Sequence, residues 1–535
     1  MGSEIGRGAR RIAANYIRLL ISVALGIALV PILLGGVGLE GFGLWGLIGA
    51  TIGFSDLFRE LVRSSMNREL GAAYHSADLA RFPAAYNAAI VVALLVSVPA
   101  ALVYIVLYWA MPLLNIEPGW LGAARQVVLN QAVYSFAIIV TAPQLNTFLV
   151  SERYTLYNLW LILDRASYFI SALVVFYAAS RPTPQEGLVA FSLGGALIAV
   201  ATLGVAVAWI MVAEPRCRPR PSLVRRTEIR AILGTTGWNA VVGLALNLHI
   251  RFDQLIMNVA FGQRANAVFS VGVRLTGYVR MLAVGMTDGL DVVGARMAER
   301  ADSSALAGMM KVSTRLHALV VLPASVAVWL MAEPLLRLWI GRHLEADDLR
   351  RAIVIVRLLV VGFAARGISD CWVRTLYGAG HIRRYAPVIL AGGLTNPLLA
   401  ILLVAVLAPP LDFYAPAVTY ALIFVIIHLL TIPFIAARCV DVTARDLLGP
   451  LVRPAIVTCV AAAVLPIGAA TIGTRTILHL GAILAIYGAV FGAGALAFGV
   501  TARERRALLR SARAAKGGRR AAEGAGITSS ATTAE

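Results

Sequence analysis

Lysine is almost absent from this chain of 535 residues, because only Lys311 and Lys516 occur beside its many arginines. Charge of either sign is scarce: charged residues make up 14% of the chain, against about 25% in a typical soluble protein. Hydrophobic residues, in contrast, make up 59% of it. This combination excludes an ordinary soluble domain and predicts an all-α membrane protein that crosses the bilayer many times.

Cysteine is scarce, and a common nucleotide-binding motif does not occur in the sequence. Cys217, Cys371, Cys439 and Cys459 form no CxxC pair and have no zinc-ligand spacing, so we interpret them as structural thiols. No Walker A motif occurs, so we do not expect ATP to be the direct energy source. We expect no metal site, no catalytic residues and no cofactor.

The formal net charge of +19 is the feature that could indicate nucleic acid. The basic residues, however, lie mostly in short segments between apolar runs, which is the pattern of cytoplasmic loops in membrane proteins. We therefore expect the lipid bilayer as a partner and no nucleic acid.

Apolar runs long enough to cross a bilayer recur along the whole chain, and we count about 14 of them. About 12 is the alternative if a weak pair, such as the last two, is misread. The runs cover approximately residues 12–34, 42–62, 86–109, 125–149, 157–179, 187–212, 237–262, 267–290, 313–332, 352–375, 387–407, 415–437, 453–471 and 477–500.

The basic residues alternate between the two sides of the predicted membrane. About 30 Arg and Lys fall on the side of the N-terminus, about 8 on the other side and about 9 inside spans, and the rich side is cytoplasmic. This predicts a multi-pass membrane protein with both termini in the cytoplasm.

The most basic internal loop, residues 213–230, separates two halves with similar numbers of spans. We predict an N-terminal lobe (1–212) and a C-terminal lobe (231–437). Two extra spans (438–500) and a basic, then disordered tail (501–535) follow.

A faint repeat links the two halves. Residues 31–46 (PILLGGVGLEGFGLWG) align with residues 257–272 (MNVAFGQRANAVFSVG), so that Gly36 matches Gly262 and Gly46 matches Gly272. The repeat suggests parallel halves that are related by an axis along the membrane normal.

Three passages combine apolar spans with glycine-rich turns: 15–48 (NYIRLLISVALGIALVPILLGGVGLEGFGLWGLI), 251–275 (RFDQLIMNVAFGQRANAVFSVGVRL) and 377–404 (YGAGHIRRYAPVILAGGLTNPLLAILLV). In these passages and in its span spacing the chain resembles the O-antigen and exopolysaccharide flippases of the multidrug/oligosaccharidyl-lipid/polysaccharide (MOP) exporter superfamily. That superfamily also contains multidrug/toxin extrusion transporters and lipid II flippases.

The resemblance implies two pseudo-symmetric six-helix lobes around a central cavity, with two further helices at the C-terminus. It also implies a transporter, not an enzyme, that moves a polyprenyl-pyrophosphate-linked glycan by alternating access. The resemblance also suggests a glycan polymerase or other export machinery as a further partner, and the bacterial cytoplasmic (inner) membrane as the location.

The stretch 237–262 carries three ionisable residues near mid-membrane: His249, Arg251 and Asp253. A charge at that depth costs roughly 2.5–3.5 kcal/mol, so it normally faces protein or a wet cavity. At about 100° per residue, His249 and Asp253 share one helix face and Arg251 points away from it. We therefore favour Arg251 as a residue of the central cavity, with a structural ion pair as the alternative.

Other ionisable residues inside spans complete the candidate site. Arginines suit a pyrophosphate because the guanidinium group makes bidentate phosphate contacts. The candidates for an anionic head group, besides Arg251, are Arg18, Arg274, Arg280 and Arg366. The candidates for coupling or structural pairing are His249, Asp253, Asp164 and Asp370, and Arg366 with Asp370 could equally form an i,i+4 pair.

Two other kinds of function remain open. A multidrug or cation antiporter of the same superfamily should favour carboxylates and aromatic side chains in its cavity over arginines. A glycan polymerase or glycosyltransferase needs catalytic residues on a sizeable outside loop. The longest outside loop predicted here covers residues 333–351 and has no recognisable catalytic acid pair.

Overall fold

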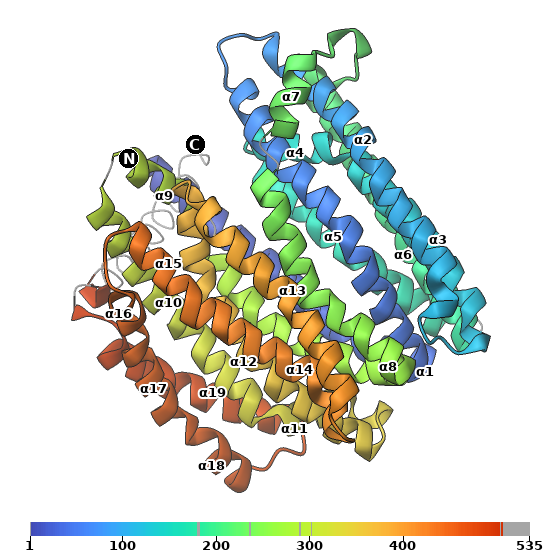
Figure 1. The fold of residues 1–535 in the computed structure, drawn as a ribbon, viewed down its shortest axis with the longest axis vertical. Coiled ribbons are helices and arrows are strands. Elements are labelled where there is room, and N and C mark those ends of the chain that lie inside the picture. The colour runs from blue at the N-terminus through green and yellow to red at the C-terminus, as the bar shows by residue number, and fades with distance from the viewer. Residues whose placement is uncertain are drawn as a thin grey trace, which may run out of the picture.

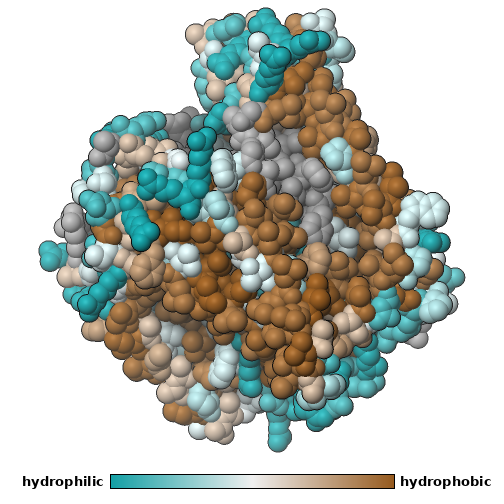
Figure 2. All heavy atoms as spheres, viewed as in Figure 1, coloured by the Kyte–Doolittle hydropathy of each residue, from teal (hydrophilic) through white to brown (hydrophobic). Residues whose placement is uncertain are grey.

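The computed structural model describes residues 2–178, 182–234, 237–287, 290–300, 302–502 and 504–506. Within these residues the chain forms helices joined by short turns, and they contain no strand. Twelve of the described helices are long and apolar enough to cross a membrane. Figure 2 shows apolar side chains over the middle of the visible face and polar side chains gathered toward its ends. The protein therefore has the architecture of a multi-pass membrane protein, as its composition predicts.

Six helices build the N-terminal lobe (Figure 1): α1 (Gly2–Tyr74), α2 (Arg81–Ala110), α3 (Leu121–Val140), α4 (Ala142–Val150), α5 (Tyr154–Leu173) and α6 (Pro184–Ala213). The predicted span 125–149 is divided between α3 and α4. Pro143, in the first turn of α4, has no N–H to continue the hydrogen-bond ladder of α3. The start of α6 is fixed by a capping box, in which Thr183 and Glu186 bond each other's backbone.

The linker and the C-terminal lobe follow: α7 (Arg226–Gly234), α8 (Gly237–Thr287), α9 (Leu290–Glu299), α10 (Ser303–Leu330), α11 (Ala332–Ile340), α12 (Ala346–Gly378), α13 (Ile382–Val406), α14 (Leu411–Phe424) and α15 (Ile432–Cys439). A π-helical turn at Val425–Thr431 joins the last two. The predicted outside loop 333–351 is largely helical, because Leu336 and Ile340 give α11 a buried apolar face.

The final helices are α16 (Ala444–Leu448), α17 (Val452–Ala462), α18 (Val464–Thr471) and α19 (Ile477–Gly494). They lie along the C-terminal lobe, and the Tyr487 hydroxyl of α19 donates to the Pro323 carbonyl of α10 over 3.0 Å. The predicted span 453–471 is broken between α17 and α18. Of the tail that we predict to be basic and then disordered (501–535), the part from residue 507 onward lies outside the described residues.

Two helices bend at a glycine with positive φ. Gly38 in α1 has φ 71° and ψ −176°, and Gly262 in α8 has φ 83° and ψ 179°. This conformation is readily open only to glycine, and it turns the chain sharply between two helical segments. When α1 and α8 are each counted as two segments, the twelve candidates become fourteen (12 + 2), the number that the sequence predicts.

The two bends also correct the alignment of the repeat. The structure pairs Gly38 with Gly262, whereas the sequence pattern pairs Gly36 with Gly262, so the predicted alignment is wrong by two residues. Gly36 lies inside a helix and does not form the bend. A glycine is needed there because a Cβ would lie 2.3 Å from the ring of Phe176. Several glycines close together made the correct pairing ambiguous from sequence alone.

The largest apolar core joins the two lobes beside the bends. It contains Phe42 and Leu47 of α1, Phe269 of α8, Trp120 before α3 and Ile340 of α11, all of them buried. Figure 1 shows α1 and α8 meeting at their bends, while the lobes diverge toward the ends that carry α7 and α9. The lobes are thus held together at one end of the molecule.

Candidate functional site

The lobe interface is built by α1 and α8, whose backbones touch where they cross. A Cβ at Gly43 would lie 1.9 Å from the carbonyl oxygen of Gln263, and a Cβ at Gly46 would lie 2.4 Å from the Ser270 Oγ. Small residues are therefore required for the two helices to approach this closely. On both sides of this crossing, side chains of α1 face the C-terminal lobe and side chains of α8 face the N-terminal lobe.

Near the two bends, polar side chains form hydrogen bonds between the lobes. Asn266 donates to the Gly43 carbonyl over 2.9 Å, and the Glu117 N–H donates to Gln263 Oε1 over 2.9 Å. Asn258 donates to the Leu114 carbonyl. Because these bonds satisfy backbone groups of the opposite lobe, separating the lobes here would leave polar groups without partners.

Arg251 projects from the first half of α8 toward the N-terminal lobe. Its Nη1 donates to the carbonyl of Gly49 in α1 over 2.9 Å, and the side chain is half-buried. The prediction that Arg251 points away from His249 and Asp253 is confirmed. The arginine thus lies at the lobe interface, at the depth where the two lobes face each other.

His249 and Asp253 face α13 inside the C-terminal lobe. Both are fully buried, and Asp253 Oδ1 accepts a hydrogen bond from Asn396 over 3.0 Å. A Cβ at Gly392 of α13 would lie 2.9 Å from the His249 ring, so this glycine makes room for the histidine. The pair therefore lies behind the surface that α8 presents to the other lobe.

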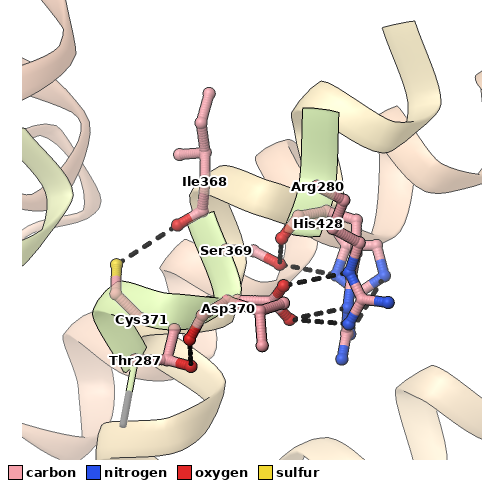
Figure 3. Close-up of polar contacts among 9 residues, drawn as sticks. Arg280, Thr287, Ile368, Ser369, Asp370, Cys371 and His428 are labelled. Atoms are coloured by element: carbon pink, nitrogen blue, oxygen red, sulfur yellow. Dashed lines mark hydrogen bonds and ion pairs between the residues drawn. The ribbon is translucent and has the colours of Figure 1, made fainter. Parts of the chain in front are cut away.

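Asp370 binds two arginines in the interior of the C-terminal lobe (Figure 3). Its Oδ2 lies 3.1 Å from Arg280 Nε of α8, and its Oδ1 lies 2.9 Å from Arg366 Nε one turn earlier in α12. The i,i+4 pair that the sequence offered as one alternative is present, and Arg280 joins it from another helix. Two cations and one anion leave this cluster with a net positive charge.

His428 extends the same cluster from the π-helical turn after α14. Its Nδ1 lies 2.8 Å from the Ser369 Oγ, and its Nε2 lies 3.4 Å from Arg366 Nη1. Asp370, Arg366 and His428 are at most 5% exposed. The cluster therefore ties α8, α12 and the turn together through buried polar contacts.

Arg274 and Arg165 interact electrostatically across the interface between the lobes. Arg274, in the second half of α8, lies within electrostatic range of Arg165 of α5 and of Tyr278. Its guanidinium also stands over the ring of Phe42, 5.4 Å from the centroid. Among the described residues, neither Arg274 nor Arg165 forms an ion pair. Two like charges without a described acid beside them are suited to binding an anion.

Arg18 and Asp164 belong to the N-terminal lobe. Asp164 accepts a hydrogen bond from the Tyr134 hydroxyl of α3 over 2.6 Å. In the same region the Tyr168 hydroxyl donates to Gln131 Oε1 over 3.1 Å. The Nε of Arg18 is buried and has no hydrogen-bond partner in the described part of the chain. Hydroxyl and amide groups therefore lie beside the few charged residues of the N-terminal lobe.

The linker 213–230 is anchored to the N-terminal lobe. Arg216 Nε donates to Glu214 Oε1 over 2.7 Å, and the Tyr74 hydroxyl at the end of α1 donates to Glu214 Oε2 over 3.1 Å. The bond from Arg216 lowers the pKa of Glu214, and burial raises the pKa of Tyr74. The guanidinium of Arg216 also lies 4.6 Å from the Tyr74 ring centroid.

Sequence reasoning missed several residues of these clusters, among them His428, Arg165, Asn396 and Tyr134. His428 was detectable as an ionisable residue inside an apolar span. Arg165 directly follows Asp164 in the sequence, and sequence alone does not distinguish it as a residue of the lobe interface. Asn396 and Tyr134 gave no signal, because uncharged polar residues are common in membrane helices. Among the described residues, no group of three or more His, Cys, Asp or Glu side chains could hold a metal ion.

No family model and no curated protein matches the sequence. Solved structures do match its fold. An inward-facing multidrug resistance MATE family transporter of the MOP superfamily aligns with a TM-score of 0.66 at 13% identity, over 79% of this chain and 98% of that chain. The lipid II flippase MurJ, in an inward closed conformation, aligns with a TM-score of 0.70 at 11% identity, over 90% of this chain and 97% of that chain.

A third match is a MOP superfamily transporter from Pyrococcus furiosus, described as having a binding pocket of reverse polarity and a different function. It aligns with a TM-score of 0.59 at 13% identity, over 81% of this chain and 96% of that chain. Together these matches give the chain the fold of the MOP superfamily transporters, with two pseudo-symmetric lobes. At such low identity the likeness concerns the fold alone.

Proposed function

We propose that this protein is a flippase that moves a polyprenyl-pyrophosphate-linked oligosaccharide across the cytoplasmic membrane by alternating access between its two lobes. The glycan is a precursor of O-antigen, exopolysaccharide or a similar polymer. The observation that carries the proposal is the placement of Arg274 and Arg165. They belong to opposite lobes, the Arg274 guanidinium stands over Phe42 of α1 in the other lobe at 5.4 Å from the ring centroid, and neither arginine forms an ion pair with a described acid.

A pyrophosphate would relieve the repulsion between these two arginines. Its anionic oxygens are prohibitive to carry through hydrocarbon unaided, whereas guanidinium groups replace their hydration with charge-assisted hydrogen bonds. A ligand that touches Arg274 and Arg165 at once also links the two lobes. Binding of the head group is thereby coupled to the relative position of the lobes.

The other candidates take different roles in this proposal. Arg251 and Arg18 are further contacts for the head group, and Tyr134 and Gln131 meet sugar hydroxyls. Arg280 and Arg366 are structural, because Asp370 neutralises part of their charge inside one lobe. His249, Asp253 and Asp164 keep either a coupling or a structural role.

Two alternatives within the superfamily share this fold. A lipid II type substrate carries the same pyrophosphate, so the arginines accommodate it equally well. A multidrug or cation antiporter should favour carboxylates or aromatic faces for its cargo. A multidrug resistance MATE family transporter is among the matched structures. The excess of arginine at the lobe interface favours the anionic lipid. A catalytic role is not part of the proposal.

Reconstituted vesicles test the proposal. A polyprenyl pyrophosphate that carries a fluorescent sugar is placed in both leaflets, and its accessibility to a membrane-impermeant quencher is followed with time. We expect the full-length protein to move the lipid, and Arg274→Ala and Arg165→Ala each to slow movement at least about tenfold.

Arg337→Ala is the matched control, because Arg337 is exposed on α11 and pairs with Glu333. It should transport at the rate of the natural protein. Transport of an organic cation such as ethidium, with no movement of the pyrophosphate lipid, would instead establish the antiporter alternative.

A further inference from the structure

A second group of cations lies apart from the lobe interface, on the outer side of the C-terminal lobe. Here the first half of α10, the short helix α16 and the start of α17 surround a pocket of about 320 Å³. Four cations line it: Lys311, Arg315, Arg445 and Arg453. Asp446 is the acid among the residues that line it.

Two of the four cations are neutralised. Lys311 Nζ lies 3.3 Å from Asp446 Oδ1, and Arg315 Nη1 lies 2.5 Å from Glu504 Oε1 at the C-terminal end of the described chain. Arg445 and Arg453 form no ion pair with any residue that the structure describes. Four cations against two acids leave the pocket with two uncompensated positive charges.

Two further observations indicate that the pocket is built for an anion. The Nε of Arg315 is buried and has no hydrogen-bond partner in the described part of the molecule, although the same guanidinium binds Glu504. Glu504 is itself held in place, because its carboxylate accepts the Thr501 N–H over 2.8 Å. The Arg315 guanidinium is thus already placed to bind anionic oxygen atoms.

The wall beside the pocket is apolar and faces outward. Val452, Ile456 and Phe498 are 55%, 47% and 48% exposed, and Arg453 lies over the Phe498 ring at 5.5 Å from its centroid. These residues belong to the stretches Ala444–Thr471 and Ile477–Gly499, which are long and apolar enough to cross a membrane, so we expect their side chains to face lipid tails. A charged pocket therefore adjoins a surface for hydrocarbon.

We propose that this pocket binds a phosphate group, carried by an anionic membrane lipid such as phosphatidylglycerol. Guanidinium groups bind phosphate oxygens in a bidentate manner, and basic pockets between membrane helices take lipid head groups. The lipid tails lie along Val452, Ile456 and Phe498. A soluble phosphate ester shares the anionic chemistry but makes no use of this apolar wall.

The decisive variant is the double substitution Arg445→Gln with Arg453→Gln. It removes the two uncompensated charges and leaves the ion pairs Lys311–Asp446 and Arg315–Glu504 intact. The matched control is Arg337→Gln with Arg350→Gln, which removes two exposed cations of α11 and α12, each paired with an acid of its own helix, Glu333 and Asp347.

Native mass spectrometry of the full-length protein in neutral detergent measures the binding, with phosphatidylglycerol, phosphatidylcholine and inorganic phosphate as separate probes. We expect phosphatidylglycerol to bind most tightly and the double variant to lose roughly 10- to 25-fold in affinity, about fivefold for each cation removed. The control variant should bind as the natural protein does.

The three probes separate the sources of the phosphate. If inorganic phosphate displaces phosphatidylglycerol at equal concentration, the pocket is a phosphate site but its ligand is soluble. If the double variant binds phosphatidylglycerol as tightly as the natural protein, the pocket holds no phosphate and the inference is wrong. Neither outcome depends on transport, so the proposed flippase function is tested separately.

Discussion

Arg251 and Asp253 are two residues apart in α8, yet they bind groups in opposite lobes. Arg251 donates to the Gly49 carbonyl of α1, whereas Asp253 accepts a hydrogen bond from Asn396 of α13. The helical rotation of about 100° per residue separates the two side chains. The helix α8 therefore places a cation at the lobe interface and buries an acid within its own lobe. Because Arg251 and Asp253 point in different directions, Asp253 does not neutralise the charge of Arg251 at the interface.

Arg251→Ala should abolish movement of the pyrophosphate lipid while the protein inserts at normal levels. Arg251 is half-buried, and its described hydrogen bond goes to a backbone carbonyl, so its loss should leave the melting temperature close to that of the natural protein. Arg251→Lys should recover part of the activity, because lysine keeps the charge but loses the bidentate fork. Transport assays and thermal melting on the same preparations give both readouts.

The opposite result would give Arg251 a structural role. If Arg251→Ala folds poorly and the additional removal of an acid restores folding, Arg251 is a structural residue, and its assignment to the head group is wrong. Arg337→Ala again serves as the control for the loss of one exposed guanidinium.

Gly38→Ala and Gly262→Ala should each destabilise the protein by about 1–2 kcal/mol, because alanine is strained at positive φ. The cost is conformational, since the nearest atom outside the local backbone lies at 3.5 Å or more from an added Cβ at either site. Gly277→Ala is the matched control: it lies in helical α8 with no atom within 4 Å, so it should be neutral or slightly stabilising. Thermal melting decides, and equal melting of Gly38→Ala and Gly277→Ala would contradict the bend.

The sequence predicts what depends on local periodicity and fails where contacts come from distant segments. It predicts the membrane spans, the opposed faces of Arg251 and Asp253, and the i,i+4 pair of Arg366 with Asp370. It does not reveal that Arg280 joins this pair, because that contact spans 90 residues. Arg165 is missing from the predicted head-group candidates for the same reason: its relation to Arg274 arises only when the lobes assemble.

The linker anchor should depend on pH through Glu214. Its pKa is lowered by the bond from Arg216, so the anchor stabilises the folded protein above the ordinary carboxyl pKa and is lost as pH falls through the lowered value. Proteolysis within residues 213–230 should therefore increase below about pH 4. Glu214→Gln should be cleaved readily even at neutral pH. Cleavage that is independent of pH in the natural protein would show that Glu214 does not hold the linker.

The orientation in the membrane is a prediction from the alternation of basic residues. Reporter fusions measure it directly, with an alkaline phosphatase that is active outside the cytoplasm and a fluorescent protein that is active inside. We expect fusions to be external at residues 115, 183, 410 and 473 and cytoplasmic at residues 222, 380 and 515. An external fusion at residue 515 would contradict both the even number of spans and the placement of the termini.

Asp370→Ala should be the most destabilising of these substitutions, by about 3–5 kcal/mol, because it leaves the charges of Arg280 and Arg366 without their buried partner. Arg280→Gln should cost less, since Arg366 and Asp370 still neutralise each other. Adding Arg366→Gln to Asp370→Ala should restore part of the stability, because one unpaired charge is then removed. Asp347→Ala, at an exposed pair with Arg350, is the control and should change stability by less than about 0.5 kcal/mol. Thermal melting of the purified protein measures all four. If Asp370→Ala melts like the natural protein but no longer moves the lipid, the carboxylate acts in transport and the cluster is part of the substrate path.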